Sequence, residues 1–272
     1  MAKIFIEPIE QKHIQRVFQA KEEAKREDSR NYLGFSGIGD ECMRKVWYDF
    51  RGYDGTVIPG RVKMIFDLGH KIEELSCHYL RLAGYKLEHA WPDEQMSFSA
   101  INGLFRGHPD GVIHGVTAKP HMLEIKSANK NRFEQFKKKG FAHDQKYHAQ
   151  IQLCMMYAGL ERGFVFIYCK DNCDIHIERM YYDEKIALHF YDVAGTIIAS
   201  PHPPERGHKE TDIKCNWCHH NMRCWSNMGI QKRKTCGTCQ HLKSGIQMKC
   251  DKKKVDIVKW GLSCEEWKLN DC

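Results

Sequence analysis

Apolar and polar positions change their spacing several times along the chain, and each spacing predicts a different element. Residues 64–85 place apolar side chains about 3.6 residues apart, which predicts a helix that ends at Gly84. The apolar positions of this helix are Ile72, Leu75, Tyr79 and Leu82. Residues 105–113 and 121–128 instead have the residue types of strands, and the turn-rich segment between them predicts that they pair as antiparallel neighbours.

A second helix and two more strands follow this hairpin. Residues 143–163 carry apolar positions at helical spacing, with Tyr147 and Gln150 near the start. The runs FVFIYCK (164–170) and CDIHIERMYY (173–182) predict two further strands. Helices and strands in this order predict an α/β fold, in which a central mixed β-sheet carries the acidic residues and helices flank it.

The chain has 272 residues, of which 42% are hydrophobic, enough for one large or two modest domains with a buried core. No apolar run approaches the ~18 residues of a membrane span, and the N-terminal MAKIFIEPIEQKH lacks the sustained apolar stretch of a secretory signal. We therefore expect a cytoplasmic protein. Pro and Gly gather in SPHPPERGHKE (200–210), which predicts a linker or extended loop.

Thirteen cysteines in such a protein indicate metal ligation rather than disulfides, because the cytosol keeps thiols reduced. The last group of four has the spacing of a zinc ribbon, and two tryptophans flank its final member. Its members are Cys236, Cys239, Cys250 and Cys264. We expect them to hold one tetrahedral Zn²⁺ in a zinc-ribbon-like module of residues 231–272, which is too short to form a core otherwise.

A group of three cysteines precedes that module. Cys215, Cys218 and Cys224 form a C-x2-C-x5-C set that lacks a fourth ligand. The best candidate for the fourth ligand is Cys42, which lies at the start of a helix predicted over residues 42–50. Joining Cys42 to the later group would close a long loop, which is worth about 5 kcal/mol on the chain-entropy treatment. The site would act as a staple.

Other cysteines and phenylalanines have simpler interpretations. The remaining cysteines, without ligand spacing, are Cys77, Cys154, Cys169, Cys173 and Cys272. Cys154 and Cys169 lie in apolar segments and are expected to be small core residues. In the basic stretch NRFEQFKKKGF, Phe133, Phe136 and Phe141 could stack on unpaired bases. Helical spacing also permits Phe133 and Phe136 to be core contacts, and we favour that alternative for them.

The predicted hairpin of residues 105–128 carries the candidate chemistry. Side chains alternate along a strand, so Glu124 and Lys126 share one face while Ile125 points into the core. Asp110 can reach the same face from the neighbouring strand. Two carboxylates and an ammonium suit a hard divalent cation such as Mg²⁺ or Mn²⁺, with the lysine left to orient or deprotonate a water. The alternative is an exposed cross-strand salt bridge that contributes little.

The order of four short motifs makes this site more specific. They are Gly69-x3-Glu73, Pro109-Asp110-Gly111, Glu124-Ile125-Lys126 and the helix residue Gln150. This order, over roughly residues 30–226, resembles the RecB-like branch of the PD-(D/E)XK nuclease superfamily. The entry CMRKVWY and the C-x2-C-x5-C exit resemble AddB and the CRISPR-associated RecB-type exonucleases, where one cysteine before the nuclease core and three after it hold a [4Fe-4S] cluster. The glutamine helix also resembles that of lambda-type phage exonucleases.

The resemblance implies a restriction-endonuclease-like core within a domain of residues 1–230, held by an iron-sulfur staple. The staple ligands would be Cys42, Cys215, Cys218 and Cys224. Spacing alone does not distinguish this cluster from zinc at the same cysteines. Several RecB-type enzymes use a histidine in the first motif, and His70 directly follows Gly69 here. We favour Glu73 as the ligand and His70 as a helix-surface residue.

The resemblance also implies a role for each of the other motif residues. Asp110 and Glu124 would be the central metal ligands beside Glu73, and Ile125 would lend its backbone carbonyl. Lys126 would be the catalytic lysine, and Gln150 would position that lysine or the substrate phosphate.

The activity implied is that of a metal-dependent DNA exonuclease, a hydrolase that cuts phosphodiester bonds at single-stranded or duplex ends and leaves 5′-phosphates. Its setting would be recombination, repair or phage DNA processing in a bacterial cytoplasm, alongside a recombination or annealing protein. Two alternatives stay open. One is a structure-specific endonuclease of the same superfamily, and the other is a non-catalytic DNA-binding adaptor that keeps the scaffold and the cluster.

The net charge of the protein gives little support for a nucleic-acid partner, and the distribution of charge gives more. The formal net charge of +7 falls to about +3 if each four-thiolate metal site carries two negative charges. The distribution is more informative, because residues 232–234 and 249–254 concentrate lysines and an arginine around the last cysteine group. This suits phosphate contacts, and a solvated basic surface is the alternative.

Overall fold

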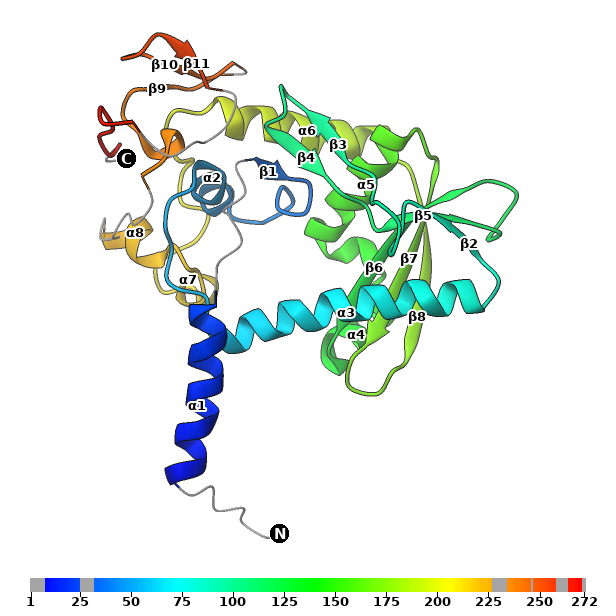
Figure 1. The fold of residues 1–272 in the computed structure, drawn as a ribbon. Helices are drawn as coiled ribbons and strands as arrows, with labels where there is room; N and C mark the ends of the chain where they lie inside the picture. The colour runs from blue at the N-terminus through cyan, green and yellow to red at the C-terminus, as the bar shows by residue number, and fades with distance from the viewer. Residues whose placement is uncertain (1–7, 25–31, 227–233, 246, 258–263, 271–272) are drawn as a thin grey trace.

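A five-stranded sheet lies at the centre of the protein, in the spatial order β2-β5-β6-β7-β8. The computed structural model describes residues 8–24, 32–226, 234–245, 247–257 and 264–270 (Figure 1). The strands are β2 (Lys86–Glu88), β5 (Gly111–His114), β6 (His121–Ala128), β7 (Arg162–Cys169) and β8 (Ile175–Tyr181). β6 and β7 run parallel, and the other neighbours run antiparallel. The expected mixed sheet is confirmed.

Helices cover both faces of this sheet. α3 (Gly60–Leu82) packs on one face, in a cluster that includes Leu123 and Ile125 of β6. α5 (Gln145–Ala158) contacts the opposite face, and α6 (Glu184–Ala199) packs against α5. β7 is buried along almost its whole length, which accounts for its continuous apolar sequence. The expected α/β layering is therefore confirmed.

The predicted strand of residues 105–113 is wrong as a single element. β4 (Phe105–Gly107) belongs to a separate small sheet with β1 (Leu33–Gly34) and β3 (Phe98–Ala100), and β5 begins only at Gly111. The break has local causes, because Pro109 has no N–H to donate and Gly111 has a φ of +142°. The chain therefore changes sheets just before β5, and Asp110 lies at that crossing.

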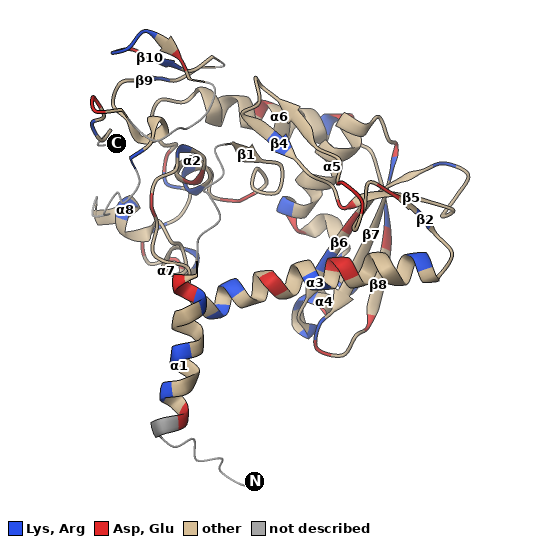
Figure 2. Cartoon of the chain, in the orientation of Figure 1, with Lys and Arg blue, Asp and Glu red and all other residues tan. Residues whose placement is uncertain are grey.

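The predicted helix over residues 64–85 is confirmed, but its buried face differs from the expected apolar positions. Of those positions Ile72 is buried, whereas Leu75, Tyr79 and Leu82 are exposed. Cys77 and Leu80 are the buried partners of Ile72. Two apolar stripes overlap on this helix, and spacing alone does not decide which one meets the sheet. Figure 2 shows acidic and basic residues interspersed along α3.

The segment after β6 settles the alternative roles of the phenylalanines. Asn129 caps the start of α4 (Lys130–Lys139), where its side chain accepts the backbone N–H of Arg132. Phe133 and Phe136 on this helix, and Phe141 in the following turn, are at most 1% exposed. They belong to the same core cluster as α5 and α6. The core interpretation is confirmed, and stacking on bases by these rings is wrong.

A second region lies around α2 (Met43–Arg51), which contacts α6, β1 and the 3-10 helix near Cys236. α2 begins directly after Cys42, as expected. The residues 200–210 contain neither helix nor strand, and two short helices follow, α7 (Ile213–Asn216) and α8 (Asn221–Ser226). The remaining described elements are α1 (Pro8–Glu23), η1 (Phe141–His143), η2 (Cys236–Thr238), β9 (Leu242–Lys243), β10 (Lys249–Cys250) and β11 (Val255–Asp256).

The C-terminal strands pack against the rest of the protein. β9, β10 and β11 form a small antiparallel sheet. The hydroxyl of Tyr53 donates to the carbonyl of Asn270 at 2.9 Å, and Met248 is buried in the main core cluster. α1 packs beside α3, where Lys63 donates to the carbonyl of Glu22 at 2.6 Å. Within the described residues, every helix is too short or too polar to cross a membrane.

Replacing Gly107 with alanine should destabilise the protein. A Cβ at Gly107 would lie 2.0 Å from the buried ring of Phe35, so the substitution overpacks the small sheet by roughly 1–3 kcal/mol. Gly195→Ala is the matched control, because a Cβ there meets no atom within 4 Å and alanine favours the helix by about 0.5–1 kcal/mol. Urea denaturation should place the two variants on opposite sides of the wild type. An unchanged midpoint for Gly107→Ala would contradict this packing.

Candidate active site

Asp110 is held at the junction between the two sheets by a backbone contact. Its Oδ2 accepts the N–H of Ile125 at 2.6 Å, and the residue is 9% exposed. The strand register explains this contact. Gly111 of β5 lies opposite Leu123 of β6, and the two strands are antiparallel, so Asp110 lies beside the next residues of β6, Glu124 and Ile125. Asp110 and β6 are thus fixed relative to each other without any surface side chain.

Glu124 and Lys126 share the face of β6 that points toward α5, as expected from alternation. Glu124 is 0% exposed and forms an ion pair with the ammonium of Lys126. That ammonium also lies 5.0 Å from the centre of the Tyr147 ring in α5. Apart from the ion pair, neither carboxylate oxygen of Glu124 meets a hydrogen-bond donor among the described residues. Ile125 is 6% exposed and lies in the core under α3.

One cavity of about 600 Å³ brings together most of the expected residues. Its lining includes Glu73 from α3, Asp110 before β5, Lys126 from β6 and Gln150 from α5. His70 is exposed, as expected for a helix-surface residue, and also lines this cavity. Further lining residues are Tyr32, Gly34, Phe35, Ser36, Glu74, Trp91, Asp93, Gln95, Arg106, Gly107 and His108.

Sequence reasoning missed the wall formed by residues 91–108. Gln95 donates to the carboxylate of Glu73 at 2.7 Å, which orients the acid that we favoured as a ligand. The local sequence of this segment has no strong periodicity. Gln95 lies just before β3 of the small sheet, and the hydrophobic pattern predicted neither β3 nor the contact with Glu73.

Three acids of the candidate site have raised pKa values: Glu73 and Asp110, which line the cavity, and Glu124, which is buried beside Lys126. Burial, and then the charge of Asp110, raise the pKa of Glu73 to about 7. Burial raises the pKa of Glu124 to about 8, although Lys126 acts in the opposite direction. Burial likewise raises the pKa of Asp110. Burial would lower the pKa of Lys126, but the carboxylates of Glu124 and Asp110 outweigh it and raise that pKa. A bound cation would relieve the repulsion among these acids.

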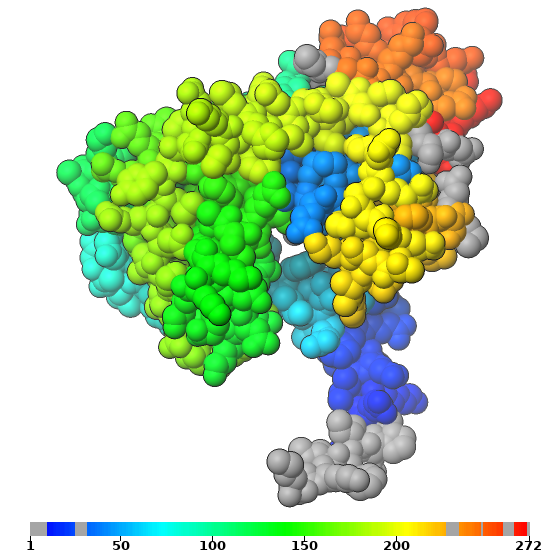
Figure 3. All heavy atoms as spheres, turned by 180° about the vertical axis from the view of Figure 1, so that it is seen from behind, coloured from blue at the N-terminus to red at the C-terminus, as the bar shows by residue number. Residues whose placement is uncertain are grey.

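Three of the four predicted iron-sulfur ligands line one cavity, and the fourth lies outside it. Cys42, Cys215 and Cys218 line a cavity of about 760 Å³. Figure 3 shows the green region around α4 and α5 and the yellow segment near residues 205–220 on either side of a hollow. The backbone N–H of His220 donates to Cys218, while burial raises the pKa of that thiol. Cys224 is outside the lining and packs against the main core. Their metal remains a prediction.

The four predicted zinc ligands surround a smaller space. Cys236, Cys239, Cys250 and Cys264 all line one cavity of about 20 Å³. Apolar residues close it, namely Leu242, Ile257 and Trp267. The backbone N–H of Lys253 donates to Sγ of Cys250 at 3.4 Å, a contact that favours a thiolate. Burial, and then the neighbouring thiols, raise the pKa of Cys236. The metal here also remains a prediction.

The remaining described cysteines differ in burial, and the described lysines of the second basic cluster form ion pairs. Cys154 and Cys169 are 0% exposed, which confirms them as core residues; Cys77 is also buried and Cys173 is exposed. Cys272 and residues 232–233 lie outside the described residues. In the second basic cluster, Lys254 pairs with Asp251 and Lys249 with Asp256. The described lysines are thus partly neutralised by nearby acids.

The closest grouping of metal-binding residue types was missed altogether. Among the described residues, Asp49, His219 and His220 are the only set of three or more such side chains whose donor atoms all lie within 4.8 Å of one another. The acids of the cavity and the two cysteine groups are more widely spaced than this. The pair of histidines directly after Cys218 was a visible signal. Their partner Asp49 lies far away in the sequence.

Comparison with known proteins leaves the family open. The sequence matches no protein-family model and no curated protein. A solved structure of LHK-Exo in complex with dAMP is 16% identical, with a TM-score of 0.46 over 68% of this chain and 90% of that chain. SSO0001 is 15% identical, with a TM-score of 0.46 over 80% and 98%. The alkaline exonuclease LHK-Exo from Laribacter hongkongensis is 17% identical, with a TM-score of 0.45 over 68% and 90%.

The raised pKa values predict how stability depends on pH in metal-free protein. Glu73 and Glu124 have an ordinary value of 4.5, so the folded state binds more protons than the unfolded state between that pH and about 8. The free energy of unfolding should therefore fall as the pH rises through this window. Urea denaturation with a chelator present measures the slope, and Glu124→Gln should flatten it.

Glu161→Gln is the matched control for this slope. Glu161 is exposed and pairs with Lys119, and that hydrogen bond lowers its pKa. Its substitution should leave the slope between pH 5 and 8 as in the wild type. Identical slopes for Glu124→Gln and the wild type would show that Glu124 does not hold a proton in the folded state.

Proposed function

We propose that the protein is a metal-dependent deoxyribonuclease that hydrolyses phosphodiester bonds, acting as an exonuclease at DNA ends. One observation carries the proposal: Glu73, Asp110, Lys126 and Gln150 come from separate parts of the chain and line a single cavity. A volume of about 600 Å³ is within the usual range for small-molecule sites, so a nucleotide would fit. This combination of acids and a lysine matches the motif order that resembles the PD-(D/E)XK superfamily.

The donor set suits Mg²⁺ or Mn²⁺, which prefer oxygen ligands. The proposed ligands are Glu73, Asp110, Glu124 and the backbone carbonyl of Ile125. Glu124 supports this assignment because it is fully buried and the ammonium of Lys126 is its one described partner, so a divalent cation would satisfy its remaining oxygen. A bound ion would polarise the scissile phosphate and lower the pKa of the attacking water.

Lys126 would act as a charged group rather than as a base. Its raised pKa keeps the ammonium protonated at neutral pH while Glu124 and Asp110 are close. An ammonium beside the scissile phosphate stabilises the negative charge that develops in the transition state and can orient a water. Gln150, which is 7% exposed, would present its amide to this lysine or to the phosphate.

We further infer two cysteine-bound metal centres. Cys42, Cys215, Cys218 and Cys224 would hold a [4Fe-4S] cluster as the staple of the domain of residues 1–230. The nearness of three of them and the N–H donated to Cys218 support this. Cys236, Cys239, Cys250 and Cys264 would hold Zn²⁺ in the module of residues 231–272, and their shared small cavity supports this.

A cleavage assay tests the proposed nuclease. Labelled linear, nicked and circular DNA is incubated with Mg²⁺ or Mn²⁺ and the purified protein. The wild type should degrade linear DNA from its ends, and a chelator should stop it. Lys126→Ala should lower the rate by at least about 100-fold, because it removes a preorganised charge. Lys119→Ala is the matched control, since that lysine is exposed and pairs with Glu161.

The three forms of DNA distinguish an exonuclease from an endonuclease and from a non-catalytic adaptor. Circular DNA cut as fast as linear DNA would indicate an endonuclease. DNA binding with no cleavage of any substrate under any condition would reject the enzyme and favour the non-catalytic adaptor. Equal activity of Lys126→Ala and Lys119→Ala would reject the assigned role of Lys126.

Metal analysis tests the two cysteine-bound centres separately. Anaerobically purified protein should be brown and contain about four irons per chain. Cys215→Ser should lose iron and retain all of its zinc, whereas Cys250→Ser should lose one zinc per chain and retain iron. Zinc without iron in the wild type would contradict the cluster. Loss of both metals in either variant would show that the two groups do not form independent sites.

A further inference from the structure

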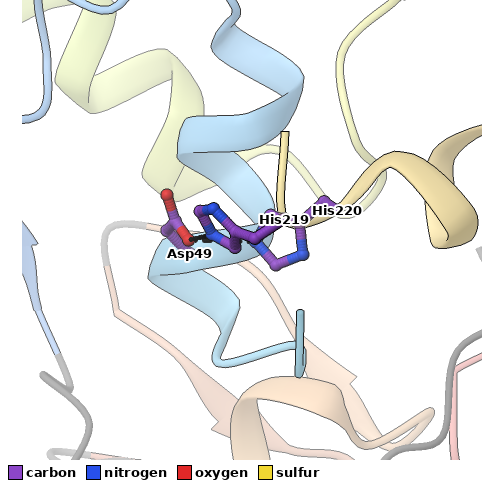
Figure 4. Close-up of side chains that lie close together, drawn as sticks. All are labelled: Asp49, His219 and His220. Atoms are coloured by element: carbon purple, nitrogen blue, oxygen red, sulfur yellow. Dashed lines mark hydrogen bonds and ion pairs between the residues drawn. The ribbon is translucent and has the colours of Figure 1, made fainter. Parts of the chain in front are cut away.

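A third cluster of metal-binding side chains lies apart from the candidate active site and includes no cysteine. Oδ1 of Asp49 contacts Nε2 of His219 at 2.7 Å and Nε2 of His220 at 2.9 Å. Figure 4 shows the two imidazoles converging on the carboxylate from one side. One carboxylate and two imidazoles form a donor set that Zn²⁺ commonly accepts in sites with an open position.

The backbone, rather than surface side chains, sets this geometry. Thr56 donates its N–H to the carbonyl of His219 at 2.8 Å. A Cβ on Gly55 would lie 2.5 Å from the ring of His219, so a glycine at this position lets the imidazole approach the chain. His220 is 1% exposed and its ring centre lies 5.2 Å from that of Tyr48. Both histidines are therefore held in place.

The electrostatic position of Asp49 favours a cation. Asp49 lies in the last turn of α2, where the helix dipole disfavours a carboxylate. The lysine one turn earlier, Lys45, pairs with Asp40 at 2.7 Å instead. The side of the cluster toward solvent is open, because the side chains of Asp49 and His219 are 48% and 35% exposed. A metal ion and a water can therefore enter.

We propose that Asp49, His219 and His220 bind a Zn²⁺ ion through Oδ1 and one nitrogen of each imidazole, with water in the fourth position. Binding replaces the two N–H contacts to Asp49 by ligand bonds, and each ring then carries its proton on the other nitrogen. The ion ties the turn after Cys218 to the end of α2, whose other end follows Cys42. This site is independent of the nuclease proposal and of both cysteine centres.

Asp49→Asn distinguishes a metal site from a hydrogen-bonded clamp. The amide oxygen of asparagine can still accept from both imidazoles, but a neutral amide is a weak zinc ligand. Full-length wild type and variant are saturated with Zn²⁺ and dialysed, and zinc per chain is measured. Asp49→Asn and His219→Ala should each bind one zinc fewer than the wild type. His189→Ala, which removes an exposed histidine on α6, should bind as many as the wild type.

Cobalt substitution identifies the ligands of the additional ion. The difference spectrum between cobalt-loaded wild type and Asp49→Asn should contain ligand-field bands without thiolate charge-transfer bands. Circular dichroism in chelator should show that both variants remain folded, and His219→Ala decides the matter if Asp49→Asn does not fold. Equal zinc in the wild type and the folded variants, or a difference spectrum dominated by thiolate bands, would overturn the proposal.

Discussion

The hydrogen bond from the backbone N–H of Ile125 to Asp110 is the contact on which the candidate active site depends. It joins the crossing between the two sheets to the middle of β6. Strand alternation then sends Ile125 into the core under α3 and turns Glu124 and Lys126 toward α5. If β6 lost this N–H, Asp110 would remain buried without its backbone donor, at a cost of about 1–3 kcal/mol.

The acidic side chains around this hydrogen bond lower the stability of the folded protein, because they are buried close to one another. Glu124 is completely buried beside Asp110, and Lys126 supplies one ammonium for two carboxylates while Glu73 stands at the edge of the same cavity. Apolar side chains of similar size would usually pack there at lower cost. Strongly shifted pKa values of acids that lie in a cavity are a common feature of functional sites. The divalent cation proposed here would neutralise the acids and offset this cost.

Sequence patterns predicted the parts of the fold that local interactions determine. The start of α5 is as expected because Asp144 caps its first turn, whereas the predicted span to residue 163 was too long, because Gly159 adopts a left-handed conformation and β7 begins at Arg162. The break between β4 and β5 was missed although Pro109 and Gly111 lie at it, because residue types alone do not show that β4 pairs with the distant β1 instead of continuing into β5. The buried face of α3 was missed because helical spacing does not specify which stripe meets the sheet. The cluster of Asp49 with His219 and His220 was missed because only the fold brings these segments together.

α2 connects two proposed metal ligands, Cys42 and Asp49, to the chain segment that lines the candidate active site. Cys42 precedes this helix and Asp49 lies in its last turn, while Trp47 is buried in the core and donates to the carbonyl of Ser200 at 3.0 Å. The segment just before α2, residues 32–36, forms part of the wall of the cavity that contains Asp110 and Lys126. Any ligand that fixes α2 against the later part of the chain therefore also fixes this wall. A staple far from the acids in sequence can in this way set the shape of the site.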